Sequence, residues 1–210
     1  MARWEPDARV RLVGAALDLF AEQGYDATTV TQIAERAGLT RSTFHRYFPD
    51  KRDLLAAGQE TLSRLLAEGV AEAPAGVTPL DAVDAGLQRA AGAMTPATRA
   101  MAPRVRAAIA ASAELQERDA LKGAGMAQAL SGALRARGVE EAIADVAGEL
   151  GVLAFKRGYA RWVSSGDDNL AGHARAALLE LAAAGAELTS RQAAPSASAA
   201  RRSSKPRTST

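Results

Sequence analysis

The fold is decided by residues 29–48, TVTQIAERAGLTRSTFHRYF, where two short helical patterns flank a glycine turn. Thr29 opens the first helix with a capping box, because Gln32 stands three residues later and can reach back to it. Gly38 ends that helix, and Thr40 caps a second one that is too short to stand alone. Two short helices joined by a tight turn are typical of a helix-turn-helix unit.

Both short helices have an inward apolar face. Its members are Val30, Ile33, Ala34, Ala37, Leu39, Phe44 and Phe48. We expect this face to pack against a preceding helix, predicted from Pro6 to Gln23, through a stripe formed by Val10, Val13, Leu17 and Phe20. This packing would leave Arg41, Ser42, Thr43, His45 and Arg46 pointing outward.

The outward residues suit the major groove of DNA. An arginine can donate two parallel hydrogen bonds to guanine, and serine or threonine can bond to several base edges. We therefore predict base contacts from Arg41, Ser42, Thr43 and His45. Phosphate contacts, which set affinity and not sequence preference, are predicted at the helix ends from Thr29, Thr40, Tyr47 and Lys51. For Tyr47 the alternative is simple packing at the rim of the domain, and for His45 it is that the side chain faces the groove without contacting a base.

Composition predicts an all-α fold for the whole chain of 210 residues. Alanine occurs 51 times, whereas aromatic residues make up only 4%, so few residues remain to build strands. The chain has no cysteine and two histidines, His45 and His173, so we predict neither a metal site nor a cofactor. No long apolar run or signal peptide is visible, so we expect a cytoplasmic protein without a membrane partner.

Helix starts and breaks predict three regions and about nine helices in total. Residues 1–52 form the three-helix helix-turn-helix domain, residues 53–188 a larger helical ligand-binding and dimerisation domain, and residues 189–210 a disordered basic tail. In the larger domain, Asp50 is expected to cap a helix that runs to Glu72. Later helices are expected to open at Thr78, at Thr95 and in the turn 167–169, with long helices over 113–137 and 140–164. The tail could add attraction to DNA or act only as a solubilising extension.

The helix predicted over residues 140–164 has two apolar stripes and therefore needs two partners. One stripe consists of Gly148, Val152, Phe155, Tyr159 and Trp162. The other consists of Ile143, Val146, Leu150 and Leu153, and the last helix carries a similar line of Leu170, Ala174, Ala177 and Leu181. We predict that these two sets form a four-helix bundle with a second chain, with small residues such as Gly185 permitting close approach. The alternative is that both helices are buried within a monomer.

Larger side chains in this alanine-rich domain are candidates for a ligand pocket. They are Met94, Met101, Met126, Phe155, Tyr159 and Trp162. Such residues also build ordinary cores, so both interpretations stay open. The cations Arg104, Arg106, Lys156 and Arg157 could pair with an anionic ligand or could be solvated surface. The predicted ligand is small and largely apolar.

Residues 9–55 resemble the DNA-binding domain of the tetracycline-repressor (TetR) family of bacterial regulators. The resemblance rests on LFAEQGY at 19–25, TTV at 28–30, AGLT at 37–40, STF at 42–44, and Tyr47, Phe48 and Lys51. It implies a homodimer on a palindromic operator, released by a small-molecule inducer, and the base and phosphate contacts named above. Family members often have an aromatic residue where this chain has His45, and histidine where it has Arg46.

Other functions remain possible at this stage. An activator or a ligand-independent regulator would share the fold, and a helical interaction protein could keep it without reading DNA. No nucleophile–base pair is readable in the sequence, so an enzyme is not expected.

Overall fold

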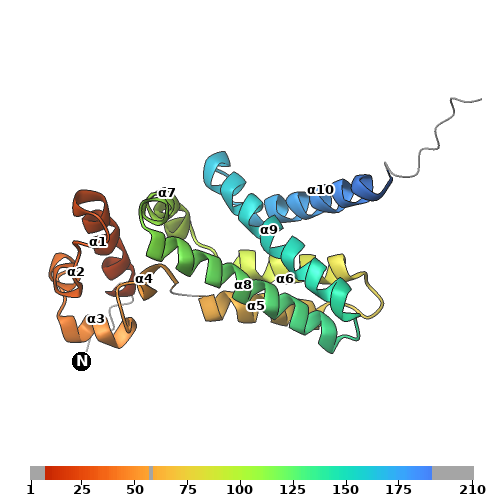
Figure 1. Cartoon of the computed structure of the whole chain (residues 1–210), viewed down its shortest axis with the longest axis horizontal. Helices are drawn as coiled ribbons and strands as arrows, with labels where there is room; N and C mark the ends of the chain where they lie inside the picture. Colours follow the sequence, from red (N-terminus) through yellow and green to blue (C-terminus); the bar gives the residue numbers. More distant parts are fainter. Residues whose placement is uncertain (1–7, 57–58, 191–210) are drawn as a thin grey trace, which may run out of the picture.

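The computed structural model describes residues 8–56 and 59–190, and that part of the chain contains helices and no strand (Figure 1). The all-α prediction is confirmed. The molecule is elongated, with α1 (Ala8–Gln23), α2 (Val30–Arg36) and α3 (Arg41–Tyr47) at one end. The C-terminal half of α10 (Leu170–Ser190) lies at the other end.

The helix-turn-helix forms as its caps predict. Thr29 and Gln32 make both halves of the capping box, and the Thr40 hydroxyl accepts the backbone N–H of Thr43 at 3.1 Å. Gly38 has a φ of +67°, which glycine adopts without strain. The guanidinium of Arg11 in α1 donates to the carbonyl of Ala37 and so fixes the turn from outside.

The packing face of α1 differs from the predicted stripe. Leu17 and Phe20 are buried as expected, but Val10 is 46% exposed and Val13 only half-buried. Leu12 and Leu19 take their place in the core. The physical reason is that α1 packs against α2 on one side and α7 (Pro96–Ala111) on another, which turns its buried face away from Val10. The predicted start at Pro6 lies outside the described residues.

The helix expected from Asp50 to Glu72 is described as two segments, α4 (Asp53–Ala56) and α5 (Gln59–Glu72). Asp50 does not cap it as predicted, because its carboxylate accepts the N–H of Lys51, the next residue. Instead, the Asp53 carboxylate accepts the backbone N–H of Asp50 at 3.2 Å. Leu54 is buried in the N-terminal core, although it follows the predicted boundary at residue 52.

The larger core is formed by α5, α6 (Pro79–Gly92), α8 (Ala113–Ala136), α9 (Glu141–Ser165) and α10. Thr78 and Thr95 cap α6 and α7 at the predicted positions. The helix α10 continues to Ser190, two residues past the predicted end of the domain, and the rest of the predicted tail lies outside the described residues. Among the described helices, none has the length and apolar character needed to cross a membrane.

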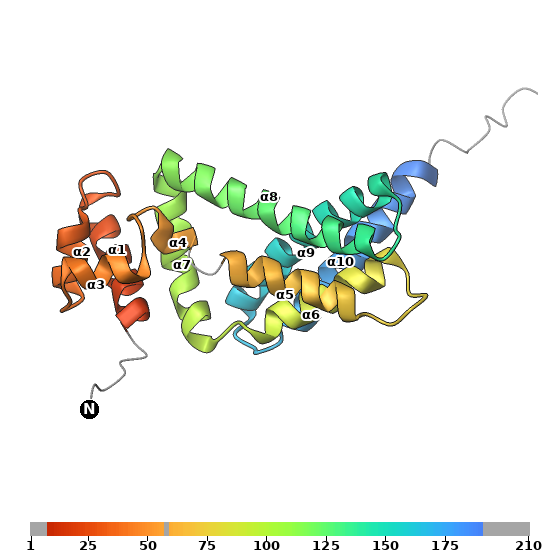
Figure 2. The ribbon, with the colours of Figure 1, turned by 90° about the horizontal axis from the view of Figure 1, so that it is seen from below.

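Two helices join the parts of the molecule. In Figure 2, α7 stands beside α1 and α4, and α8 runs from this junction along the larger core. Leu115 of α8 is buried in the N-terminal core, and Met101, Val105 and Ile109 of α7 pack against the same core. The N-terminal domain is therefore seated on α7 and on the first turn of α8.

Candidate functional site

The outer face of α3 is polar and exposed, while its inner face is buried. Phe44 and the following Phe48 are sealed in the core, and the side chains of Arg41, Ser42, His45 and Arg46 are exposed. Within the described residues, Arg41 and Ser42 have no side-chain hydrogen bond or ion pair, so both can bind an external group. This outer face of α3 therefore carries hydrogen-bond donors, those of Arg41 and Ser42, that have no partner within the described residues.

His45 is oriented by a contact with the main chain. Its Nδ1 lies 3.3 Å from the carbonyl oxygen of Pro49, and because a carbonyl oxygen can only accept, a hydrogen bond there uses a form of His45 with a proton on Nδ1. A neutral His45 then presents Nε2 as an acceptor. The neighbouring Arg46 lies over the ring of Tyr47, 5.1 Å from its centroid. The face therefore offers an acceptor at residue 45 beside the donors of Arg41.

The residues predicted to contact phosphate have partners of their own. The hydroxyls of Thr29 and Thr40 accept the backbone N–H groups of Gln32 and Thr43. Tyr47 is exposed at the end of α3. These three lie at helix ends, as the sequence analysis expects.

Lys51 has an internal role that the sequence analysis missed. Its ammonium donates to the carbonyls of Tyr25 at 2.8 Å and Thr28 at 3.1 Å, and it lies 4.2 Å from the centroid of the Tyr25 ring. Lys51 therefore holds the loop between α1 and α2 against the end of the helix-turn-helix. Its partners stand more than twenty residues away, so no local pattern reveals them.

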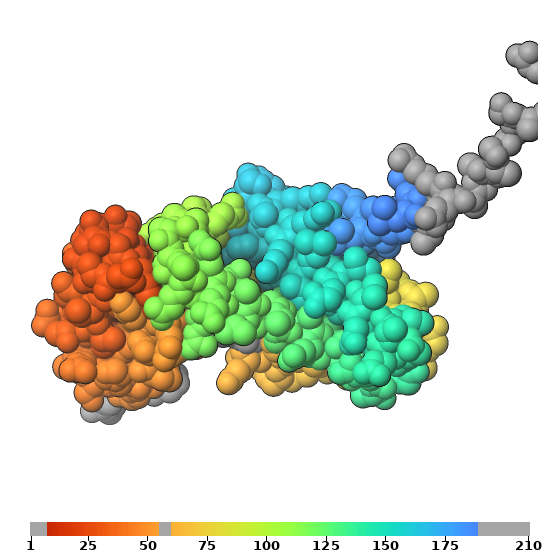
Figure 3. Space-filling model, viewed as in Figure 1, coloured from red at the N-terminus to blue at the C-terminus, as the bar shows by residue number. Residues whose placement is uncertain are grey.

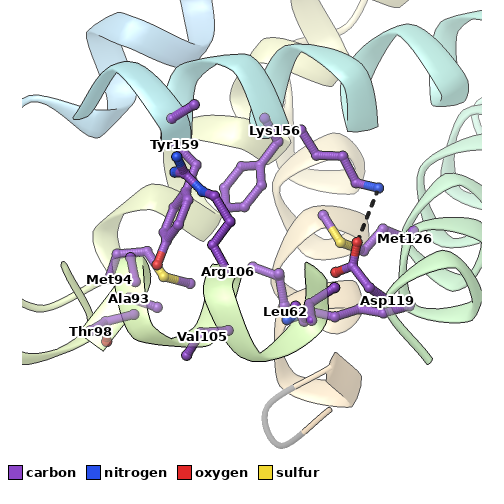
Figure 4. Close-up of a pocket in the computed structure, with 16 residues that line it drawn as sticks. Leu62, Ala93, Met94, Thr98, Val105, Arg106, Asp119, Met126, Lys156 and Tyr159 are labelled. Atoms are coloured by element: carbon purple, nitrogen blue, oxygen red, sulfur yellow. Dashed lines mark ion pairs between the residues drawn. The ribbon is translucent and has the colours of Figure 1, made fainter. Parts of the chain in front are cut away.

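A cavity of about 480 Å³ lies between α5, α7, α8 and α9 (Figure 4). Four predicted pocket residues line it: Met94, Met126, Phe155 and Tyr159. The structure corrects the other two. Met101 packs against the N-terminal core instead, and Trp162 is buried behind Tyr159, with ring centroids 5.6 Å apart.

Four charged side chains line the same cavity: Arg106, Asp119, Lys122 and Lys156. Lys156 pairs with Asp119 at 3.8 Å, as Figure 4 shows. Burial lowers the pKa of Lys122, and the charge of Lys156 adds to this effect, whereas Asp119 opposes it. Burial raises the pKa of Tyr159, and the nearby Arg106 opposes that shift.

Asp119 and Lys122 were missed from the sequence, although a signal existed. Residues 119, 122 and 126 follow helical spacing and so share one face of α8 with the predicted Met126. Among the other suggested cations, Arg104 pairs with Asp18 and donates to the carbonyl of Gly14, which ties α7 to α1. Arg157 does not line the cavity.

Side-chain contacts connect the helices of the cavity to the N-terminal domain. The Tyr25 hydroxyl donates to a Glu114 carboxylate oxygen at 3.0 Å, and Arg118 pairs with Asp53 at 2.7 Å. Val105 and Ile109 line the cavity and also pack against the N-terminal core. A change in the position of α7 or α8 would therefore shift the contacts that hold the helix-turn-helix in place.

One apolar face of α9 has no partner within the described chain. Ile143 is 53% exposed and Val146 61% exposed, with Leu153 exposed and Leu150 half-buried on the same face. Figure 3 shows the surface of α9 open between α8 and α10. The other predicted stripe, from Gly148 to Trp162, is directed into the core.

The predicted face of α10 needs correction. Leu170, Ala174 and Ala177 are buried in the larger core of their own chain, so they are not offered to a second one. The reason is Gly158 of α9, where an added Cβ would stand 2.5 Å from the backbone of Ala174. The two helices pack tightly there, whereas a Cβ added at Gly185 would meet no atom of another part of the chain within 4 Å. Leu181 is half-buried, and the large exposed apolar residues of α10 are Leu179 and Leu188.

Comparison with known proteins identifies the N-terminal domain. Residues 12–57 match the family model described as "Bacterial regulatory proteins, tetR family". The N-terminal part of the chain therefore resembles bacterial regulators of the TetR family. A curated TetR-family relative is the HTH-type transcriptional regulator BetI of Rhizobium meliloti (strain 1021), 39% identical over 82 residues. That match covers 39% of this chain and 40% of BetI, so the chain spans about two fifths of the relative's length.

Solved structures share the TetR-family fold over most of the chain. Salmonella enterica GusR is 22% identical, covering 86% of this chain and 98% of its own, with a TM-score of 0.52. The complex of SmeT with triclosan is 22% identical, covering 84% and 90%, with a TM-score of 0.50. Curated relatives that match the N-terminal part of this chain are HTH-type transcriptional regulators. Within the described residues, no group of three or more histidine and acidic side chains could hold a metal ion.

Proposed function

We propose that this chain is a homodimeric, DNA-binding transcriptional repressor that binds a palindromic operator and is released by a small-molecule inducer. The observation that carries the proposal is the outer face of α3. Nothing in folding requires a run of exposed hydrogen-bonding side chains there, whereas a DNA groove does. A protein with this role works beside the chromosome, in the cytoplasm.

Base readout is assigned to Arg41, Ser42, Thr43 and His45. Arg41 is free to donate two bonds to guanine, and a neutral His45 can accept from an amino group of adenine or cytosine. Phosphate contacts are assigned to Thr29, Thr40 and Tyr47. Lys51 can add one only by sharing an ammonium that already binds three loop carbonyls, those of Tyr25, Asp26 and Thr28.

Dimerisation is assigned to the open face of α9. Soluble monomers rarely leave a contiguous apolar surface exposed, and Ile143, Val146 and Leu153 form one here. A two-fold pair would present two copies of α3 to half-sites about 34–36 Å apart, or a multiple of this distance. A palindromic operator follows from this symmetry.

Release is assigned to the cavity and to the helices that it shares with the N-terminal domain. In the solved SmeT complex, the same fold holds the small molecule triclosan. A ligand that moves α7 or α8 would act on the domain through Val105, Ile109 and the contacts of Glu114 and Arg118. Coupling of this kind is typically worth about 1–3 kcal/mol and is reciprocal between ligand and DNA.

The test is a selection from random duplex DNA at physiological salt, with wild type, Arg41→Ala and Tyr47→Phe in parallel. We expect a palindrome, with Arg41→Ala relaxing one symmetric position and costing about 1–3 kcal/mol. Tyr47→Phe removes one hydroxyl and should weaken every selected site alike. Recovery of no motif would overturn the proposal, and Arg64→Ala, a change at an exposed side chain of α5 outside the cavity, serves as control.

A further inference from the structure

We propose that the cavity takes an amphipathic organic anion, with its carboxylate bound by Lys122 and its apolar body on the methionine and aromatic lining. This inference rests on the proposed function, because it names the class of ligand for the same site. Two features of the cavity carry it: the balance of its charges and the apolar character of most of its remaining lining.

The charges that line the cavity do not cancel. Arg106, Lys122 and Lys156 face one acid, Asp119, and only Lys156 is paired with it. Within the described residues, the side chains of Lys122 and Arg106 have no hydrogen bond or ion pair. An ammonium removed from water without a partner is costly, and a bound carboxylate would supply that partner.

The position of Lys122 makes it the central group. It comes from the same face of α8 as Asp119 and Met126, and it is half-buried. Gly123 lies beside it without a side chain, and an added Cβ there would stand 3.2 Å from the Nζ of Lys156. The glycine thus lets the second ammonium lie against α8, so that two ammonium groups border one part of the cavity.

The remaining lining is apolar and suits a hydrocarbon or aromatic body. Leu62, Met94, Met126 and Phe155 come from different parts of the chain and enclose the space between the helices. In Figure 4, the side chain of Arg106 on α7 extends toward Tyr159 on α9. A volume of about 480 Å³ is within the usual range of small-molecule sites.

This arrangement discriminates by charge. A cationic ligand would meet three like charges, and a neutral one would bury Lys122 further without pairing it. An anion also competes with Asp119 for Lys156, so the acid weakens anion binding. Removal of Asp119 should therefore strengthen binding, which a purely structural role of these residues would not do.

The test is isothermal titration of the DNA-free protein with three molecules that share one chain: octanoate, 1-octanol and octyltrimethylammonium. A fourth titrant, 2-naphthoate, tells an aromatic carboxylate from an aliphatic one. The variants are Lys122→Met, Asp119→Asn and, as a matched control on the outside of α9, Arg157→Met.

We expect one or both carboxylates to bind and the alcohol and the ammonium to bind at least roughly tenfold more weakly, as a lost charge-assisted hydrogen bond implies. Lys122→Met should weaken carboxylate binding by a similar factor, Asp119→Asn should tighten it, and Arg157→Met should leave it unchanged. Octanol binding as tightly as octanoate, an unchanged affinity in Lys122→Met, or no binding of either carboxylate would overturn the inference. A carboxylate that binds through Lys122 yet leaves DNA bound would support the anion site and contradict only the inducer role.

Discussion

At the scale of single residues, Tyr25 connects the N-terminal domain to α8. Its ring is buried against Phe20, and its hydroxyl donates to Glu114. Burial, the hydrogen bond and the charge of Glu114 all raise the pKa of Tyr25 above its usual 10.0. Because the folded state holds this proton more tightly, the contribution to stability is complete below pH 10 and is lost as the pH rises above it.

Tyr25→Phe should therefore lower the free energy of unfolding by about 1.5–3 kcal/mol at pH 7, the usual value of a hydrogen bond to a charged group. The variant should also lose less stability than wild type between pH 9 and about 11. Urea unfolding across this range is the measurement. If the free energy of unfolding falls equally with pH in both proteins, ionisation of Tyr25 is not the cause of the loss of stability at alkaline pH.

Lys122 has the opposite pH dependence. Burial lowers its pKa, so the unfolded chain binds this proton more tightly than the folded one, and stability rises as the pH approaches the usual value of 10.5. Lys122→Met should stabilise the ligand-free protein at pH 7 by on the order of 1 kcal/mol, because it removes a desolvated charge. The gain should shrink toward pH 10.5 in thermal unfolding. A destabilised variant at neutral pH would mean that the ammonium has a favourable partner.

At the scale of the helix, the sequence predicts features that depend on neighbouring residues better than features that depend on contacts far along the chain. Caps at Thr29, Thr40, Thr78 and Thr95 fix helix starts, because each acts within one turn. The buried face of α1 and the partner of Lys51 depend on helices far along the chain, so periodicity could not give them. For the same reason the sequence predicts only part of the cavity lining. Met94, Met126, Phe155 and Tyr159 are recognisable by their size in an alanine-rich domain, whereas the sequence does not distinguish Lys122 from a surface lysine.

The crossing of α9 and α10 gives the element-scale prediction. Gly158→Ala places a methyl group 2.5 Å from the backbone of Ala174, which cannot move aside as a flexible side chain would. The helices must separate, at a cost of typically 1–3 kcal/mol in the free energy of unfolding. Gly185→Ala is the matched control, since it has open space and gains up to about 1 kcal/mol of helix propensity. Chemical denaturation of both variants tests this, and equal effects would contradict it.

At the scale of the whole molecule, α7 and α8 belong to both functional regions. They line the cavity, and they also carry Val105, Ile109 and Leu115 into contact with the N-terminal core. In the proposed dimer, a rigid connection of this kind would make the distance between the two copies of α3 depend on how each cavity is filled. The dependence has meaning only in a dimer, so the open face of α9 decides whether such a mechanism operates.

Val146→Asp tests that face. Val146 is 61% exposed in the single chain, so the charge should cost the fold little, but it would be buried without a partner in a dimer. We expect the dissociation constant of the dimer to rise at least roughly 30-fold, which corresponds to a loss of about 2 kcal/mol of binding free energy at an interface. Leu121→Asp is the control, because Leu121 lies on α8 outside this face and is 54% exposed, close to the exposure of Val146. Sedimentation equilibrium measures both, with circular dichroism to verify folding. If Val146→Asp remains as dimeric as Leu121→Asp, the dimer forms elsewhere, and the apolar face of α9 needs another partner.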